Sequence, residues 1–314
     1  MKLVTFRTPE HATHAGIVHD GRVIALDYPT VLELLCDPDG IAKAQAALGS
    51  AEAAYALNQV TLCSPIPEPP SVRDFYAFEQ HVKSARAKRG LGMIPEWYEV
   101  PIFYFTNNSE IYGHDEEVPY PVGSEELDIE LEIACVIGRE GKDIPVEEAA
   151  NYIVGYTIMN DWSARDFQRR DMKLNLGPGK GKDFATSLGP WLVTPDELAP
   201  YRVGAGIPLP QRGSPAWGAG NAPALERYDM IMLARVNGKE ISRGNFSDIH
   251  YSFPQMIAWA SQNARLRVGD VLGSGTVGTG CLLELGTEVH PWFQRGDEIE
   301  LEIEGIGVLR NRIA

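Results

Sequence analysis

Cysteines are few in the 314-residue sequence, and none lies in a recognisable metal or redox motif. Cys36, Cys63, Cys135 and Cys281 are far apart, without a Cys-x-x-Cys pair or the spacing of a zinc finger. This scatter supports neither a disulfide framework nor a thiolate metal site. It favours small buried side chains in a reducing compartment.

Long apolar runs and basic residues are also scarce. No run approaches the roughly 20 apolar residues of a membrane-spanning helix, and the N-terminal segment lacks the basic start and apolar stretch of a secretory signal. The chain has 28 basic and 43 acidic residues, a formal net charge of −15, which repels nucleic-acid phosphates and anionic lipids. We expect a cytoplasmic protein that binds neither nucleic acid nor membrane.

The composition is that of a globular protein, with 44% apolar and 23% charged residues, and the length suits a large core with a small domain. Prolines in residues 65–71 predict a stiff connector. This divides the chain into a small β-rich domain at 1–64 and a core at 72–314. Residues 204–223, rich in glycine and proline, predict a long surface loop of the kind that often carries part of a site.

Strand patterns outnumber helix patterns along the chain. Alternation and turn residues predict a hairpin of 2–6 and 15–19 with an Asp20-Gly21 turn before 22–26, then strands at 127–137, 153–159, 190–194, 230–236, 282–285 and 298–303. Helices are predicted at 41–57, 146–152, 163–173 and 253–264. Without regular βαβ alternation, the fold class is α+β, dominated by β-structure.

Two glycine-rich segments match nucleotide motifs only superficially. Residues 273–278 satisfy G-x-G-x-x-G, but the strand-like Cys-Leu-Leu-Glu-Leu follows where a dinucleotide site needs a helix. In residues 177–182 the glycine spacing is wrong for a P-loop, and Asp183 stands where Ser or Thr is required. We interpret the second segment as a loop that positions a lysine.

Acidic residues alternate with apolar ones in residues 127–133, so a strand would put Asp128, Glu130 and Glu132 on one face. Residues 298–304 repeat this alternation, and a solvated sheet face explains such a pattern at least as well as a site does. The first run differs in being followed by a strand that ends at Asp161. Ser163, paired with Asp166, would cap the next helix and leave Asp161 free. Carboxylates from two strands suit Mg²⁺, Mn²⁺ or Ca²⁺.

An ordered set of short motifs over about residues 70–314 resembles the fumarylacetoacetate hydrolase family. The set comprises Asp74-Phe-Tyr76, His81, Glu130-x-Glu132, Met159-Asn-Asp161-Trp-Ser-Ala-Arg165-Asp-x-Gln168, Gly181-Lys182-x-Phe-x-Thr186, Gly189-Pro-Trp191, Gly275-Thr276 and Gly280-Cys-Leu-Leu-Glu284. The resemblance implies the family's mixed β-sandwich roll for the core, with a small N-terminal β-rich domain.

The resemblance also implies roles for individual residues. One divalent cation, Mg²⁺ or Mn²⁺ or alternatively Ca²⁺, would be held by Asp74, Glu130, Glu132 and Asp161. His81 would be the general base, oriented by Glu284, while Lys182 would offset the carboxylate charge and face a developing oxyanion. Tyr76, Arg165, Gln168 and Thr276 would contact the substrate or support the site, although Arg165 could simply pair with a carboxylate. Met172 or a neighbour replaces a tyrosine of the longer animal-type enzymes, which leaves recognition of the far end of the substrate open.

The implied reaction is hydrolysis of a carbon–carbon bond in an acylpyruvate-type or fumarylacetoacetate-like keto acid, by His81-activated water and a metal-bound enolate. The same scaffold serves oxaloacetate decarboxylases, hydroxymuconate-type isomerases and keto-deoxy-sugar-acid hydrolases or dehydratases, so the fold does not determine the reaction. A non-catalytic metal-binding module is a further alternative, disfavoured because every matched site residue is intact. A homodimer is expected, because exposed sheet edges need cover.

Overall fold

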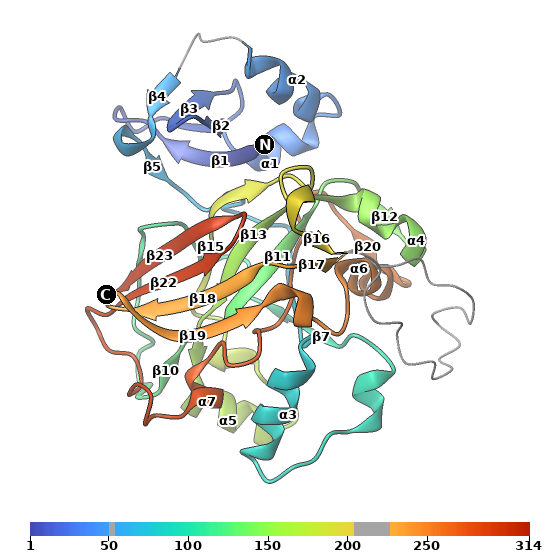
Figure 1. Ribbon diagram of the computed structural model, residues 1–314, viewed down its shortest axis with the longest axis vertical. Helices are drawn as coiled ribbons and strands as arrows, with labels where there is room; N and C mark the ends of the chain where they lie inside the picture. The colour runs from blue at the N-terminus through green and yellow to red at the C-terminus, as the bar shows by residue number, and fades with distance from the viewer. Residues whose placement is uncertain (50–53, 204–226) are drawn as a thin grey trace.

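A computed structural model describes residues 1–49, 54–203 and 227–314, which fold into β-sheets with few helices (Figure 1). The strands are β1 (Lys2–Arg7), β2 (Thr13–His19), β3 (Arg22–Ala25), β4 (Ala54–Ala56), β5 (Thr61–Leu62), β6 (Val72–Phe75), β7 (Phe103–Thr106), β8 (Ile111–Tyr112), β9 (Glu117–Val118), β10 (Leu127–Asp128), β11 (Leu131–Ile137), β12 (Gly141–Lys142), β13 (Ile153–Asp161), β14 (Ser163–Ala164), β15 (Thr186–Val193), β16 (Arg202–Val203), β17 (Arg227–Tyr228), β18 (Ile231–Val236), β19 (Lys239–Asn245), β20 (Arg265–Leu266), β21 (Val271–Gly273), β22 (Glu298–Ile303) and β23 (Gly307–Ile313). The α-helices are α1 (Val31–Cys36), α2 (Gly40–Ala47), α3 (Glu79–Ala87), α4 (Val146–Ala149), α5 (Arg165–Lys173), α6 (Phe253–Ser261) and α7 (Leu282–Leu285).

The predicted N-terminal hairpin is confirmed. β1 pairs antiparallel with β2, and β2 with β3 across the Asp20-Gly21 turn. Lys2 and Leu3 of β1 also pair with β15, which connects these strands to the sheet of the core. The proline-rich connector contains neither helix nor strand, as expected. The division of the chain at this connector stays a prediction.

The larger sheet of the described residues runs in the order β4-β3-β2-β1-β15-β13-β11-β21-β6-β7. A smaller sheet, β19-β18-β22-β23-β9, lies against β11, β13 and β15 in Figure 1. Apolar side chains from both sheets, including Ile133, Ile158, Met232 and Leu301, form one buried cluster. This arrangement confirms a β-dominated α+β fold.

The two acidic strand patterns have opposite environments. In β22 every glutamate is partly exposed and every apolar residue is buried, which is the solvated sheet face that alternation predicts. In β11 every residue is buried, because β13 and β21 flank it and the second sheet covers it. Asp128, Glu130 and Glu132 therefore lie in the protein interior, where a charged group needs a partner.

Four secondary-structure predictions are corrected. Residues 282–285 form α7 and not a strand, and the strand expected over 127–137 is interrupted between β10 and β11. The helix predicted at 41–57 ends with α2 at Ala47, and residues 54–56 form β4, which pairs with β3. Ser163 lies in β14 and donates to the carbonyl of Asp161 at 3.0 Å, so it does not cap α5. Asp166 accepts instead from the Ser124 hydroxyl at 2.7 Å.

The remaining helix predictions hold approximately. Residues 146–152 form α4 followed by a 3₁₀ turn, and α6 covers most of 253–264. The loop predicted at 204–223 lies outside the described residues. Among those that are described, no helix has the length and apolar character needed to cross a bilayer.

Candidate active site

Four buried carboxylates meet at one end of the central strands. Asp74 lies on β6, Glu132 on β11, Asp161 at the end of β13, and Glu130 just before β11. One oxygen from each lies within 4.8 Å of the others. Since β21 pairs with both β6 and β11, the sheet register itself brings Asp74 and Glu132 together. We call Asp74, Glu130, Glu132 and Asp161 the carboxylate group.

The glycine motif of residues 273–278 belongs to this site. The amide of Gly275 donates to Asp74 Oδ1 at 3.1 Å and to Glu132 Oε2 at 3.0 Å. A Cβ at Gly273 would lie 2.9 Å from these same two oxygens, and Gly275 has a φ of +77° with the Phe75 carbonyl where its Cβ would be. Close backbone approach to carboxylates therefore explains the glycines, and the dinucleotide interpretation is excluded although a short helix, α7, does follow.

Lys182 is the basic partner of the carboxylate group. It follows a 3₁₀ turn at Gly179–Gly181, and its Nζ lies 2.5 Å from Asp161 Oδ2 and 2.8 Å from Glu130 Oε2. The hydroxyl of Tyr104 on β7 also donates to Asp161 Oδ2. Lys182 is almost completely buried, so its charge acts in a medium with little screening by water.

The pKa values of the carboxylate group separate into two kinds. Burial, and then the charge of Asp161, raises the pKa of Asp74 well above its ordinary value, while burial and Asp74 do the same for Glu132. Burial also raises the pKa of Asp161, against the opposing effect of Lys182. Burial alone would raise the pKa of Glu130, but Lys182 and then Arg165 lower it to about 2.

The carboxylate group fits a hard divalent cation. Glu132 Oε1 and Asp161 Oδ1 are buried and have no hydrogen-bond partner. Unpaired buried oxygens are costly, and a cation bound among four carboxylates would satisfy them. An all-oxygen donor set of this kind suits Mg²⁺, Mn²⁺ or Ca²⁺ and does not select zinc or copper.

Arg165 is buried and binds carboxylates of the protein. Its Nε donates to Asp128 Oδ2 at 2.8 Å, and its Nη1 lies 2.8 Å from Glu130 Oε1. Burial disfavours its charge, but Asp128 and Glu130 outweigh burial and raise the pKa of Arg165. The ion-pair alternative for Arg165 is therefore the one seen. Asp128, expected on the same face as Glu130 and Glu132, is outside the carboxylate group.

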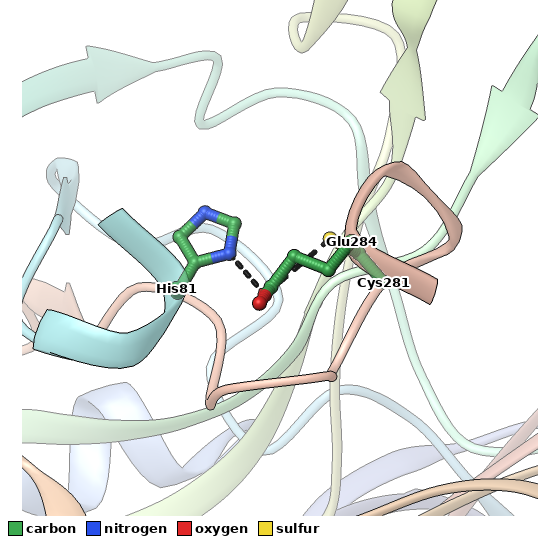
Figure 2. A group of neighbouring side chains, drawn as sticks. All are labelled: His81, Cys281 and Glu284. Carbon is green, nitrogen blue, oxygen red and sulfur yellow. Dashed lines mark hydrogen bonds and ion pairs between the residues drawn. The ribbon is translucent and has the colours of Figure 1, made fainter. Parts of the chain in front are cut away.

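His81 and Glu284 form a buried pair from distant parts of the sequence (Figure 2). His81 on α3 contacts Glu284 Oε1 on α7 through Nδ1, and both side chains are almost fully enclosed. The amide of Thr279 donates to Glu284 Oε2 at 3.2 Å. A carboxylate on Nδ1 holds the proton on that nitrogen and leaves Nε2 able to accept one.

The remaining expected substrate contacts differ in their surroundings. The Tyr76 ring, partly buried, meets the His81 ring edge-on at 5.2 Å, and burial raises the pKa of Tyr76 to about 12. Gln168 Oε1 accepts from Arg165 Nη1 at 3.0 Å, so it orients that guanidinium. Thr276 is buried and donates to the Leu131 carbonyl at 3.2 Å. Of these three residues, Tyr76 is adjacent to the His81–Glu284 pair.

Three residues of the site have partnerships that were not foreseen from the sequence. Tyr104 contacts Asp161, Asp128 contacts Arg165, and the Cys281 thiol lies 3.8 Å from Glu284 Oε1. Tyr104 could have been noticed as the one polar aromatic in Phe103-Tyr-Phe105, on the strand beside Asp74. Asp128 and Arg165 are 37 positions apart and give no local signal, whereas Cys281 and Glu284 lie only three positions apart, at the start of α7.

Comparison with known proteins identifies the family of this chain. The matching proteins are enzymes and include hydrolases, isomerases and tautomerases. The profile of the fumarylacetoacetate (FAA) hydrolase C-terminal family matches residues 71–314, and the chain belongs to this family.

Individual relatives have different activities. The fumarylacetoacetase of Arabidopsis thaliana is 34% identical over 245 residues, which are 68% of this chain and 57% of that protein, so the match spans little more than half of the plant enzyme. The mitochondrial oxaloacetate tautomerase of Homo sapiens is 29% identical over 100% of this chain and 91% of its own.

Solved structures share the fold over the whole chain. The fumarylacetoacetate hydrolase of Exiguobacterium antarcticum matches with a TM-score of 0.72 and 24% identity, over 100% of this chain and 99% of that one. The maleylpyruvate hydrolase of Sphingobium sp. SYK-6, in complex with manganese(II) and pyruvate, matches with a TM-score of 0.69 and 21% identity over the same shares.

Proposed function

We propose that this enzyme hydrolyses a carbon–carbon bond in an acylpyruvate-type or fumarylacetoacetate-like keto acid. The observation that carries the proposal is the buried His81–Glu284 pair beside the carboxylate group. Tyr76, two residues after Asp74 of the carboxylate group, meets the His81 ring at 5.2 Å, so the His81–Glu284 pair and the carboxylate group are neighbours. A base that activates water is necessary for hydrolysis and unnecessary for decarboxylation.

The carboxylate group would hold one divalent cation, Mg²⁺ or Mn²⁺ or alternatively Ca²⁺. When bound, such a cation supplies a Lewis acid for neighbouring oxygens of a keto acid. Support comes from the unpaired oxygens of Glu132 and Asp161, and from the structural relative that holds manganese(II) and pyruvate.

The protein's own groups would move the protons. His81 Nε2 takes a proton from water, and the charge of Glu284 on Nδ1 stabilises the imidazolium that forms. The water oxygen bonds to the distal carbonyl carbon, and the carbon–carbon bond breaks with its electron pair on the departing carbon. That carbon then takes the proton from His81. The products are two acids, or an acid and a ketone.

Lys182 would stabilise the negative charge that develops on the carbonyl oxygen under attack. Its ammonium is fixed in advance by Asp161 and Glu130, at 2.5 Å and 2.8 Å. A charge already in place and shielded from water stabilises a transition state without further reorganisation. Tyr76, whose ring lies against His81, would contact the substrate on the same side.

Oxaloacetate tautomerisation is a second candidate. The observation that favours it is alignment coverage. The human oxaloacetate tautomerase aligns with 100% of this chain, whereas the plant fumarylacetoacetase aligns with 68% of it. Tautomerisation needs a proton moved between carbon and oxygen and no attack by water, so it would use the same base without hydrolysis.

Product analysis distinguishes these reactions. Purified protein with Mg²⁺ or Mn²⁺ is mixed separately with acetylpyruvate, fumarylacetoacetate, the enol form of oxaloacetate, and hydroxymuconate-type and keto-deoxy-sugar acids. The proposal predicts acid products from one of the first two substrates, formed far more slowly by His81→Ala. Faster loss of enol absorbance without acid products would identify the tautomerase, and release of CO₂ the decarboxylase. Absence of carbon–carbon hydrolysis on both of the first two substrates would refute the proposal.

A further inference from the structure

Three side chains with different donor atoms lie close together at the ends of α3 and α7 (Figure 2). A ring nitrogen of His81, the sulfur of Cys281 and a carboxylate oxygen of Glu284 all lie within 4.8 Å of one another. Cys281 precedes α7 and is 1% exposed, while the side chains of His81 and Glu284 are 6% and 2% exposed. We call these three residues the His–Cys–Glu cluster.

The spacing of the cluster is close to that of a tetrahedral metal site. Bond lengths of about 2.0–2.3 Å from zinc to nitrogen, oxygen and sulfur place neighbouring ligand atoms roughly 3.5 Å apart. Cys281 Sγ already lies 3.8 Å from Glu284 Oε1. The contact between His81 Nδ1 and Glu284 Oε1 is shorter, and it would widen when a metal binds between them.

We propose that the His–Cys–Glu cluster is a second cation site, selective for a thiophilic metal such as Zn²⁺ or Co²⁺. Thiolate and imidazole ligands favour these ions over Mg²⁺ and Ca²⁺, which prefer the all-oxygen carboxylate group. The enzyme thus has two adjoining sites of opposite chemical preference. Spacing along the sequence gives no sign of this one, because His81 and Glu284 are 203 positions apart.

Protons balance when a metal enters the cluster. The Cys281 thiol, whose pKa burial raises, holds its proton until the metal replaces it, and that proton leaves to solvent. The imidazole stays neutral by moving its proton from Nδ1 to Nε2. Glu284 gives up its hydrogen bond with Nδ1 of His81 and binds the metal instead. One proton is released for each ion bound.

This chemistry makes the second site inhibitory. With the metal on Nδ1, the remaining imidazole proton occupies Nε2, so His81 can no longer accept a proton from water. The binding itself is independent of the hydrolysis proposed above, and only its effect on turnover rests on that proposal. Zn²⁺ is therefore expected to inhibit protein that already holds saturating Mg²⁺.

The test measures metal binding directly. Full-length protein carrying Cys36→Ser, which removes the exposed thiol, is kept in saturating Mg²⁺ and titrated with Co²⁺. One equivalent should produce a thiolate-to-cobalt charge-transfer band in the near ultraviolet, and Zn²⁺ should remove it. Adding Cys281→Ser should abolish the band, and adding His81→Ala should weaken Co²⁺ binding at least roughly tenfold.

Matched variants make the outcome decisive. Cys63→Ser alters a different buried thiol and should keep the band, as should Glu130→Gln, which alters the carboxylate group. Thermal unfolding of each variant without Co²⁺ checks that it is folded. No band in the parent protein, a band that survives Cys281→Ser, or Zn²⁺ binding lost in Glu130→Gln and kept in Cys281→Ser would each overturn the proposal. None of these readouts depends on turnover, so failure of the proposed function would leave them unchanged.

Discussion

The backbone amide of Leu282 donates a hydrogen bond to Asp128 Oδ1 at 2.8 Å, and the next amide, that of Leu283, reaches Oδ2 at 3.0 Å. Asp128 therefore caps the first turn of α7, the helix that carries Glu284. On its other side, Asp128 accepts from Arg165, which also pairs with Glu130. Asp128 thus connects α7, which carries Glu284, to Glu130 of the carboxylate group through Arg165.

Replacing Asp128 should destabilise the whole protein. Asp128→Ala leaves the buried Arg165 short of one partner and uncaps α7, so the free energy of unfolding should fall by about 3–5 kcal/mol in denaturant titrations. Glu240→Ala is the control, because Glu240 makes a similar two-bond pair with Arg243 at the surface, with side chains 40% and 55% exposed. That substitution should cost less than about 1 kcal/mol. Equal losses at the two positions would contradict this assignment.

Removing one carboxylate should abolish cation binding without unfolding the protein. The raised pKa of Glu132 shows that its charged form is disfavoured by burial and by Asp74, so Glu132→Gln should be at least as stable as the wild type when metal is absent. The wild type should gain about 2.7 kcal/mol of stability from Mn²⁺ at 100 times its dissociation constant, and the variant almost none.

The matched control for this experiment is Glu300→Gln. Glu300 lies in the similar alternating sequence of β22 but is partly exposed on a sheet face. It should show the full stabilisation by Mn²⁺ in thermal unfolding and the wild-type affinity in calorimetric titration. Equal effects of Mn²⁺ on the two variants would mean that the wrong acidic strand has been assigned to the metal.

Loss of the proposed base should affect catalysis and not cation binding. His81→Ala should lower kcat by roughly 10²–10⁴-fold on whichever keto acid is hydrolysed, while Mn²⁺ affinity stays as in the wild type. Glu284→Gln should lower kcat less, because the imidazole remains and loses only its charged partner. If His81→Ala retains the wild-type kcat for hydrolysis, another group activates water.

Local sequence patterns predicted the elements that depend on neighbours in the chain. The hairpin at the N-terminus and the exposed acidic strand β22 were predicted because alternation and turn residues act over a few positions. Residues 127–133 show the same alternation as β22, yet all are buried. The difference comes from two long-range contacts of β11. β21 pairs with it and β18 of the second sheet packs against it, and both lie more than 90 positions further along the chain.

Parts of the site that depend on long-range contacts could not be predicted from local patterns for a related reason. Residues 282–285 look like a strand, but the Asp128 side chain satisfies the first amides of a helix there, and Asp128 is more than 150 positions away. Gly273 and Gly275 match part of a nucleotide-binding motif. Only the structure shows their role, which is to leave room for the carboxylate oxygens of Asp74 and Glu132 close to the backbone. The carboxylate group itself was anticipated through the family resemblance, since alternation alone favoured a solvated face.

The enzyme should be a homodimer in solution. β7 is the last strand of its sheet, and its Phe105 side chain is 61% exposed, next to the exposed Ile102. An apolar edge strand of this kind normally has a covering partner. Light scattering at micromolar concentration should give twice the chain mass of 34.6 kDa, and Phe105→Lys should lower that mass. A wild-type mass of one chain would contradict the expectation.

Two partly buried histidines should make the protein less stable in mild acid. Burial lowers the pKa of His114, with Arg310 adding to the effect and Asp115 opposing it, and burial likewise lowers the pKa of His250 among the rings of Trp97 and Tyr251. His114 Nδ1 also accepts the amide of Arg310 at 3.2 Å, a hydrogen bond that protonation of this nitrogen would remove.

The direction of the pH effect follows from which state binds more protons. An unfolded histidine titrates near 6.5, above the lowered folded pKa, so between these two values the unfolded chain binds more protons and stability rises with pH. Through these two histidines the free energy of unfolding should therefore fall as the pH is lowered from 7.5 through 6.5 to 5.5, while the raised pKa values of Asp74 and Glu132 act in the opposite direction. His114→Gln and His250→Gln should each reduce that fall in denaturant titrations, whereas His19→Gln, at a side chain that is 55% exposed, should preserve it. If both variants keep the full wild-type difference, these two imidazoles are not the cause of the acid sensitivity.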